Sequence, residues 1–295
     1  MNDQAEGLRK IISNLETGVN VSKKANRAKV LAITSGKGGV GKTNIAVNFA
    51  ISLRLLGYKV LILDVDFGLA NVDIITGTYI KKTISDCIKS DLDIDKVINE
   101  GPEGIKIISG GSGFYELSIM NEKNIEKFLN LVEKLESTMD YIIIDTGAGV
   151  SNTVLKFVMA AEEAIIVTTP EPTSIMDSYT MIKALILNGY DGRLNILANI
   201  VNNRKEAYDI YNKLETVSKN FLNCKLNFLG YIEKSDTILK AVRNQIPFVI
   251  LNPKDSVSKS IKVIALKFAD TNSYMINNKK GKFAERLKKL LFMKR

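Results

Sequence analysis

The segment Gly36–Thr43 constrains this chain more than any other part of it, because it demands a strand, a tight loop and a helix in that order. Its spacing, Gly-x-x-x-x-Gly-Lys-Thr, is typical of a phosphate-binding P-loop. The run Val30–Thr34 before it is short and apolar, as expected of a buried parallel strand. Four apolar residues recur at helical spacing after it: Ile45, Phe49, Leu53 and Leu56. Motif and flanks agree, which makes a glycine-rich turn without a ligand a poor alternative.

The loop has the groups that a nucleoside triphosphate tail requires. That tail is a dense anion, and it is bound by converging backbone N–H groups, a helix N-terminus and a fixed cation. Glycines permit the left-handed turns and the close backbone approach. Lys42 is expected to reach the β- and γ-phosphates, and the Thr43 hydroxyl to bind Mg²⁺. The predicted nucleotide-binding residues of this segment are Gly36, Lys37, Gly38, Gly39, Val40, Gly41, Lys42, Thr43 and Asn44.

Three acidic residues are expected at the ends of two further strands. The run Lys59–Leu63 leads to Asp64 and Asp66, and the run Tyr141–Ile144 leads to Asp145. Open α/β sheets bind ligands at the carboxyl ends of their strands, and a carboxylate there can hold Mg²⁺ or its water shell. Any one of these acids could instead cap the next helix. Three of them at corresponding strand ends, beside a P-loop, favour a nucleotide-bound metal.

The rest of the pattern predicts an α/β fold, a doubly wound P-loop domain with a mostly parallel sheet and helices on both faces. Strand-like apolar runs lie near 30–34, 59–64, 105–109, 141–145, 164–169, 194–201, 226–232 and 246–250. Amphipathic stretches between them include 122–138, 174–187 and 256–268. The predicted organisation is a helix at 1–16, a linker at 17–28, the P-loop domain at 29–270, a second linker at 271–281 and an amphipathic helix at 282–295.

Composition excludes several classes of protein. The chain of 295 residues has no histidine, so His-based acid–base catalysis and His-ligated metal sites are ruled out. Its two cysteines, Cys87 and Cys224, lie far apart in the sequence. They indicate no disulfide framework, zinc site or iron–sulfur site, and fit a reducing cytoplasm. The N-terminus is polar rather than a signal peptide, and no apolar run approaches the ~20 residues of a membrane-spanning helix.

The net charge of +9 resides in the two ends of the chain. Residues 279–295 contribute +7 and residues 1–29 contribute +3, which leaves −1 for residues 30–278. This distribution gives no support for a basic DNA-binding face across the core. No direct contact with nucleic acid is therefore expected.

Lys37 and the loop that follows it resemble the deviant Walker A motif of the MinD/ParA ATPase family, in which the extra lysine crosses a dimer interface to the partner's nucleotide. Three further stretches are similar to the flagellar branch of that family, the FlhG (FleN or YlxH) regulators: Asp64–Asp73, Asp145–Gly149 and Thr169–Ile175. The resemblance runs through nearly the whole chain. Gly147 stands where the commoner family motif has proline, and glycine is typical of the flagellar branch.

This resemblance implies ATP and Mg²⁺ as cofactors, and it gives individual residues a role. Lys37 is implied as the signature lysine and Lys42 as the Walker lysine. Asp66 is implied as the group that positions or activates the attacking water, and these three residues are expected to be catalytic. The residues implied at the metal are Thr43 as a direct ligand and Asp64 and Asp145 in the outer shell.

Three residues far from the P-loop in sequence are also implied as nucleotide contacts. Glu171 corresponds to an interface acid near the signature lysine. Asn199 corresponds to an asparagine that contacts adenine, and Pro253 falls in a segment that borders the base. A buried asparagine at position 199 can equally serve to satisfy backbone groups of the core.

Residues 3–9 match the activator motif of the flagellar branch, Asp-Gln-Ala-x-x-Leu-Arg. Asp3 followed by Glu6 is a plausible helix start. The resemblance implies that this segment activates FlhF, an SRP-type GTPase. A glutamine can orient a hydrolytic water in another protein's GTP site, so Gln4 is the predicted activating residue. The alternative is a helix docked on its own domain.

The segment 282–295 places Phe283, Leu287, Leu290 and Leu291 on one helical stripe with basic residues beside or opposite it. A helix of this length reaches ~21 Å, too short to span a bilayer but suited to lie in its interface. We predict that these four residues bind an anionic membrane surface, more strongly when a dimer doubles them. The alternative is an ordinary surface helix packed on the core.

Together these features predict a slow regulatory ATPase. ATP assembles a homodimer, the dimer binds the inner face of the cell membrane, and hydrolysis returns it to the cytoplasm. The resemblance implies control of flagellar number and placement, through FlhF and through flagellar basal-body proteins or a transcription regulator. Two alternatives stay open. One is a MinD-type division-site ATPase, whose chain begins near the P-loop strand. The other is a ParA-type DNA-partition ATPase, against which the near-neutral core argues.

Overall fold

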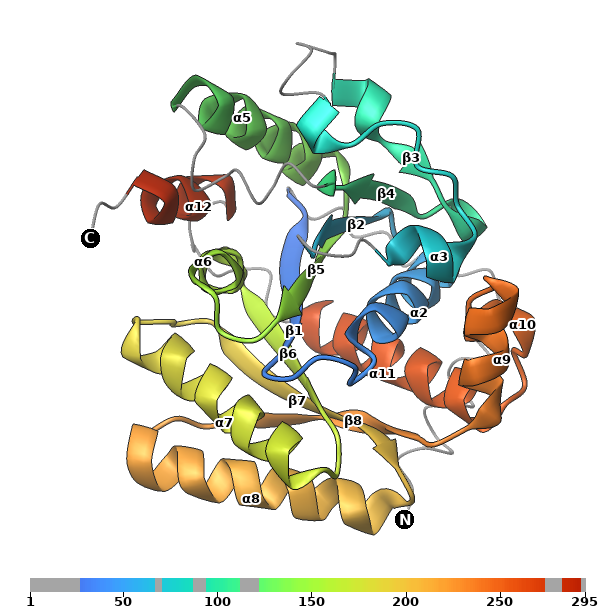
Figure 1. Ribbon diagram of the computed structural model, residues 1–295, viewed down its shortest axis with the longest axis vertical. Coiled ribbons are helices and arrows are strands. Elements are labelled where there is room, and N and C mark those ends of the chain that lie inside the picture. Colours follow the sequence, from blue (N-terminus) through green and yellow to red (C-terminus); the bar gives the residue numbers. More distant parts are fainter. Residues whose placement is uncertain (1–26, 67–70, 87–93, 112–121, 274–282, 293–295) are drawn as a thin grey trace.

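The computed structural model describes residues 27–66, 71–86, 94–111, 122–273 and 283–292. Within these residues a central eight-stranded sheet carries helices on both faces (Figure 1). The strands are β1 (Lys29–Ser35), β2 (Val60–Val65), β3 (Asn99–Glu100), β4 (Lys106–Ser109), β5 (Tyr141–Ala148), β6 (Glu163–Thr168), β7 (Arg193–Val201) and β8 (Asn227–Glu233). The predicted doubly wound α/β fold is confirmed.

The strand order β3-β4-β2-β5-β1-β6-β7-β8 determines where a ligand can bind. All neighbouring strands run parallel except the short pair β3–β4, which is antiparallel. Parallel strands end at the same edge of a sheet, so β2, β5, β1, β6, β7 and β8 all deliver their carboxyl ends to one side. The loop after β1 lies in the middle of this edge.

The two faces of the sheet are covered by different helices. One face packs against α2 (Lys42–Leu55), α3 (Val72–Thr76), α9 (Asp236–Asn244), α10 (Phe248–Leu251) and α11 (Ser256–Ser273). The other packs against α5 (Glu122–Thr138), α6 (Asn152–Ala160), α7 (Pro172–Leu187), α8 (Arg204–Leu222) and α12 (Phe283–Phe292). β1 serves both cores by alternation, since Val30 and Ala32 face the second set and Leu31 and Ile33 the first.

The predicted strand at 246–250 is wrong, because this run forms the short helix α10 instead. Pro247 is the residue before the helix, and its carbonyl accepts the N–H of Ile250 at 2.9 Å. The helix is held in place by two buried hydrogen bonds: the Val249 N–H donates to Asn48 Oδ1 of α2 at 3.0 Å, and the Phe248 carbonyl accepts from the Ser258 hydroxyl at 2.9 Å. A short apolar run has no periodicity that separates a buried strand from a buried helix.

Helix α12 is packed on the core, against α5 and α6 (Figure 1). Phe283 and Leu287 have no exposed surface, and Leu290 and Leu291 are partly buried against the same core. The apolar stripe that the sequence predicts for membrane binding therefore faces the protein core in this structure. This is the arrangement of the alternative prediction, a surface helix packed on the core. Among the described helices, none is both long and apolar enough to cross a bilayer.

Parts of the predicted organisation fall outside the described residues. These are the segment 1–16 with Gln4, nearly all of the linker 17–28, and most of the linker 271–281. Helix α11 continues to Ser273, three residues beyond the predicted end of the P-loop domain at 270.

Candidate functional site

The loop between β1 and α2 has the backbone conformation of an anion-binding nest. Gly39 and Gly41 adopt φ values of 77° and 89°, in the left-handed region that favours glycine. The Ser35 hydroxyl donates to the Lys37 carbonyl at 2.7 Å and steadies the start of the loop. Helix α2 begins at Lys42, so the unpaired N–H groups of its first turn and its dipole are available to a phosphate.

Two glycines allow neighbouring elements to press directly against this loop. A Cβ on Gly36 would lie 2.1 Å from the backbone carbonyl of Asp177 in α7. A Cβ on Gly41 would lie 2.5 Å from Nδ2 of Asn199, at the end of β7. Neither position has room for a side chain, so the loop is held between α7 and β7.

Asn199 of β7 hydrogen-bonds to the backbone of the P-loop. Its Nδ2 donates to the Val40 carbonyl at 2.8 Å. Its Oδ1 is buried and has no hydrogen-bond partner among the described residues. In this structure Asn199 thus satisfies a backbone group, which is the alternative role considered for it, and its contact with adenine stays a prediction. Pro253 is exposed, follows α10, and is absent from the pocket described below.

The acids predicted at the strand ends come together beside the loop. Asp64 and Asp145 are opposite each other in the register of β2 and β5. Burial raises the pKa of Asp64, and the charge of Asp145 raises it further. Burial also raises the pKa of Asp145, although the Thr43 hydroxyl and the Lys42 ammonium partly offset the rise. Both carboxyls are therefore short of positive charge.

Asp66 is placed next to this pair by its own backbone. Its N–H donates to Asp64 Oδ1 at 3.0 Å. A Cβ on Gly147 would lie 3.4 Å from Asp66 Oδ1, so the Asp66 carboxylate lies close to this glycine near the end of β5. The three acids and the P-loop thus meet at one edge of the sheet, as the sequence predicts.

These residues fit Mg²⁺ that is shared with a nucleotide. Asp64 Oδ2 is buried without a hydrogen-bond partner in the described part of the chain, and the Asp145 carboxylate is buried beside the Thr43 hydroxyl and the Lys42 ammonium. No group of three His, Cys, Asp or Glu side chains among the described residues could hold a metal ion alone. Mg²⁺ commonly takes one or two protein ligands, several waters and substrate phosphates, and this donor set matches that habit.

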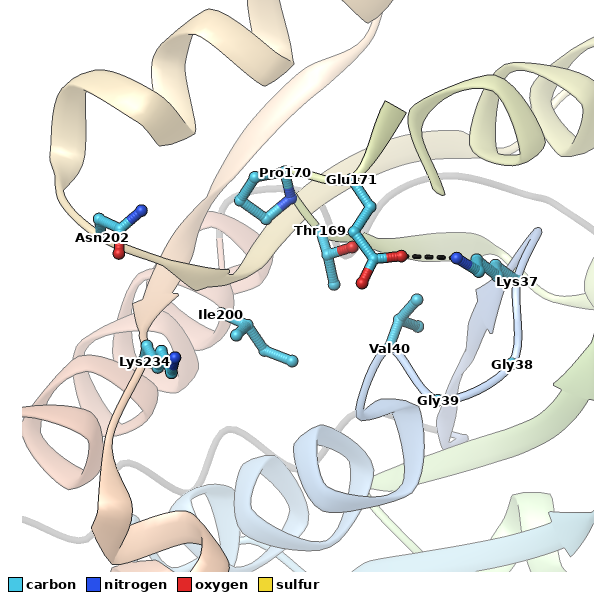
Figure 2. Close-up of a pocket in the computed structure, with 10 residues that line it drawn as sticks. All are labelled: Lys37, Gly38, Gly39, Val40, Thr169, Pro170, Glu171, Ile200, Asn202 and Lys234. Atoms are coloured by element: carbon cyan, nitrogen blue, oxygen red, sulfur yellow. Dashed lines mark hydrogen bonds and ion pairs between the residues drawn. The ribbon is translucent and has the colours of Figure 1, made fainter. Parts of the chain in front are cut away.

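The two lysines of the loop have different surroundings. Lys42 is 7% exposed and lies near Asp145. Lys37 points the other way, to the start of α7, where its Nζ lies 2.5 Å from Glu171 and 2.9 Å from the Thr173 hydroxyl (Figure 2). Lys37 and Glu171 both remain well exposed, with 37% and 64% of their side-chain surfaces accessible. The predicted proximity of Glu171 to Lys37 is thus present within one chain.

A pocket of about 270 Å³ adjoins Lys37 (Figure 2). Its lining consists of Lys37, Gly38, Gly39, Val40, Thr169, Pro170, Glu171, Ile200, Asn202 and Lys234. Ile200, Asn202 and Lys234 are not among the site residues predicted from the sequence. They lie at the ends of β7 and β8, so the strand-end argument that located Asp64 would also have located them if extended to these two strands.

Ile200 has a strained backbone at the mouth of this pocket. Its φ of 58° is rare for a β-branched residue. It lies where the pairing of β7 with β8 shifts register between Asn199 and Val201. Strain of this kind costs about 1–3 kcal/mol and tends to occur at functional sites. The backbone strain at Ile200 therefore lowers the stability of the fold beside this pocket.

Comparisons with known proteins place this geometry in context. The sequence model of the ParA family, described as NUBPL iron-transfer P-loop NTPase, matches residues 26–269. Antiactivator FleN of Pseudomonas aeruginosa is 35% identical over 239 residues, covering 81% of this chain and 85% of that protein. The flagellum site-determining protein YlxH of Helicobacter pylori is 38% identical over 267 residues, covering 90% of each.

Solved structures agree on the fold. The septum site-determining protein MinD of Pyrococcus horikoshii, complexed with Mg-ADP, superposes with a TM-score of 0.67 at 22% identity, covering 85% of this chain and 99% of that one. In the MinC:MinD cell division complex of Aquifex aeolicus the TM-score is 0.66 at 26% identity, covering 82% and 96%.

The close packing of the loop can be tested with two glycines of the same motif. Gly36→Ala should lower the free energy of unfolding by about 1–3 kcal/mol, because its Cβ must displace the α7 backbone. Gly38→Ala is the matched control, since its Cβ would meet only the Ala148 side chain, at 3.9 Å, and should change stability by less than about 0.5 kcal/mol. Urea denaturation without nucleotide measures both. Equal losses would contradict the packing described.

Proposed function

Because the chain belongs to the ParA/MinD family of P-loop NTPases, we propose that it is an ATP-driven switch that controls the number and placement of flagella. The flagellar role is proposed from two of its relatives, the antiactivator FleN and the flagellum site-determining protein YlxH. The observation that carries the switch is the pair of lysines in one loop, with Lys42 turned inward to the phosphate nest and Lys37 turned outward to Glu171.

The inner half of the site is suited to ATP hydrolysis. Lys42 and the backbone of the loop hold the β- and γ-phosphates. When bound, Mg²⁺ neutralises phosphate charge, with Thr43 as its ligand and Asp64 and Asp145 around its water shell. Asp66, fixed by its N–H on Asp64, orients the attacking water.

The outer half of the site is suited to a second copy of the chain. The Lys37–Glu171 pair is exposed, and exposed ion pairs contribute only about 0–1 kcal/mol. A triphosphate offers several negative charges and attracts a lysine more strongly than one solvated carboxylate does. Lys37 can therefore leave Glu171 and neutralise the nucleotide bound by the partner, which makes the dimer depend on ATP.

Light scattering of the Asp66→Ala protein tests this assembly. With ATP it should be a dimer and with ADP a monomer, because removal of Asp66 leaves ATP unhydrolysed. Addition of Lys37→Ala should abolish the dimer, whereas Lys82→Ala, which removes an exposed lysine elsewhere, should not. A dimer that forms equally well with ADP, or that tolerates Lys37→Ala, would refute the switch.

Membrane binding through α12 requires this helix to leave its present position. Phe283 and Leu287 cannot face α5 and α6 and a lipid layer at the same time, and both are fully buried. We propose that α12 detaches in the ATP-bound dimer and inserts its apolar face into the membrane interface. Its basic residues would then favour anionic lipid by about 1 kcal/mol each, and two helices per dimer would add avidity.

Co-sedimentation with anionic vesicles tests the anchor. Binding should require ATP and disappear when residues 282–295 are deleted. The pair Lys288→Glu and Lys289→Glu should weaken binding several-fold at low salt while leaving the buried face intact, because both residues are exposed on α12. Lys213→Glu together with Lys219→Glu, both exposed on α8, is the matched double charge reversal and should have little effect. Binding that survives the deletion would place the anchor elsewhere.

The N-terminal segment gives the switch an output. We propose that it activates an SRP-type GTPase, FlhF, through Gln4, which can orient water in the GTPase site. A peptide of residues 1–20 should stimulate GTP hydrolysis by FlhF, and Gln4→Ala should remove the effect while Asn14→Ala in the same peptide keeps it. An inactive wild-type peptide would exclude this output and leave the ATPase switch untouched.

A further inference from the structure

We infer that Glu136 is a latch shared by the two ends of the described chain, so that docking of α12 and anchoring of the chain at Arg27 strengthen each other. Glu136 belongs to α5 and is 2% exposed. It contacts residues that are more than a hundred positions away on either side in sequence.

The carboxylate of Glu136 holds the start of α12. Its Oε1 accepts the N–H of Phe283 at 2.9 Å, and its Oε2 accepts the N–H of Ala284 at 3.1 Å. The first N–H groups of a helix have no partner within the helix. Here a buried carboxylate from another helix supplies that partner, and its charge also suits the positive end of the helix dipole. Docking of α12 therefore depends on Glu136 as well as on apolar contact.

The same residue holds the other end of the described chain. Arg27 Nη1 lies 3.6 Å from Glu136 Oε1 and 3.4 Å from Glu162 Oε1. The N–H of Ala28 donates to the backbone carbonyl of Glu136 at 2.6 Å. Glu136 thus binds the entry into β1 through both its side chain and its backbone.

The two sets of contacts are coupled because they compensate one charge. A buried carboxylate is costly unless hydrogen bonds and a cation compensate it. When α12 leaves, water reaches Glu136, and the higher local dielectric weakens its attraction to Arg27. When Arg27 leaves, docking of α12 buries a carboxylate that has lost this cation, which makes docking less favourable. Each partner therefore binds Glu136 more weakly in the absence of the other.

The consequence of this coupling rests on the proposed function, although the coupling itself does not. Arg27 immediately follows the segment 1–26, which contains Gln4. Detachment of α12 would loosen the point from which that segment departs. Detachment of α12 for membrane binding would thereby alter how the segment 1–26 is anchored to the domain.

Hydrogen exchange of the full chain, without nucleotide or lipid, tests the latch in both directions. Arg27→Met should make the amides of 283–292 exchange about three- to tenfold faster. Deletion of 282–295 should speed exchange of the Ala28 amide by a similar factor. A third variant, Glu136→Gln, is described below. Its matched control is Glu126→Gln, an exposed residue on the same helix, which should change neither exchange rate.

Glu136→Gln should loosen both ends at once, because it removes the charge and keeps the size of the side chain. If this variant does not fold, the Arg27 variant and the deletion still decide the question. Unchanged exchange of α12 in Arg27→Met, or of Ala28 in the deletion, would overturn the coupling. Since no ATP or membrane is present, that result would leave the proposed switch standing, and failure of the switch would leave the latch standing.

Discussion

The close contact between the P-loop and the elements on either side of it is the constraint on which the site depends. Gly36 lies against the backbone of α7, and Gly41 lies against Asn199 of β7. A side chain at Gly36 would meet the backbone of α7, and one at Gly41 would displace the Asn199 side chain, so the loop is packed closely between α7 and β7. Interiors packed to this density transmit small displacements rather than absorb them. The same packing fixes the positions of Glu171, at the start of α7, and Ile200, near the end of β7.

The charged groups of the site form a buried set on one side of the loop and an exposed set on the other. On the inner side, Asp64 and Asp145 are buried opposite each other, and burial raises the pKa of both carboxyls. On the outer side, Lys37 and Glu171 are balanced and solvated. A bound cation would stabilise the two buried acids most. The exposed Lys37–Glu171 pair is the easier one to separate. A bound nucleotide would therefore meet buried acidic groups on the inner side of the loop and an exposed ion pair on the outer side.

The sequence was sufficient for the parts of the structure that depend on local pattern. The helix expected at 122–138 has those bounds in the structure, and Asp64 and Asp145 meet because parallel strands end at one edge. It was insufficient where tertiary contact decides. Within the run 246–250, the helix Phe248–Leu251 forms where Asn48 supplies a partner for the backbone, and the apolar stripe of α12 packs against the folded α5 and α6. Neither partner can be identified from the segment itself.

The central position of β1 has a consequence for biosynthesis. This strand pairs with β5 and β6, whose partners in the register begin at Tyr141 and Glu163. A nascent chain that has just exposed β1 thus carries an apolar strand with both edges open, and long-range pairing of this kind is slow. The sheet cannot close around it until the chain has emerged as far as Thr168. Ribosome-bound intermediates of this protein are therefore natural clients for chaperones that shield unpaired strands.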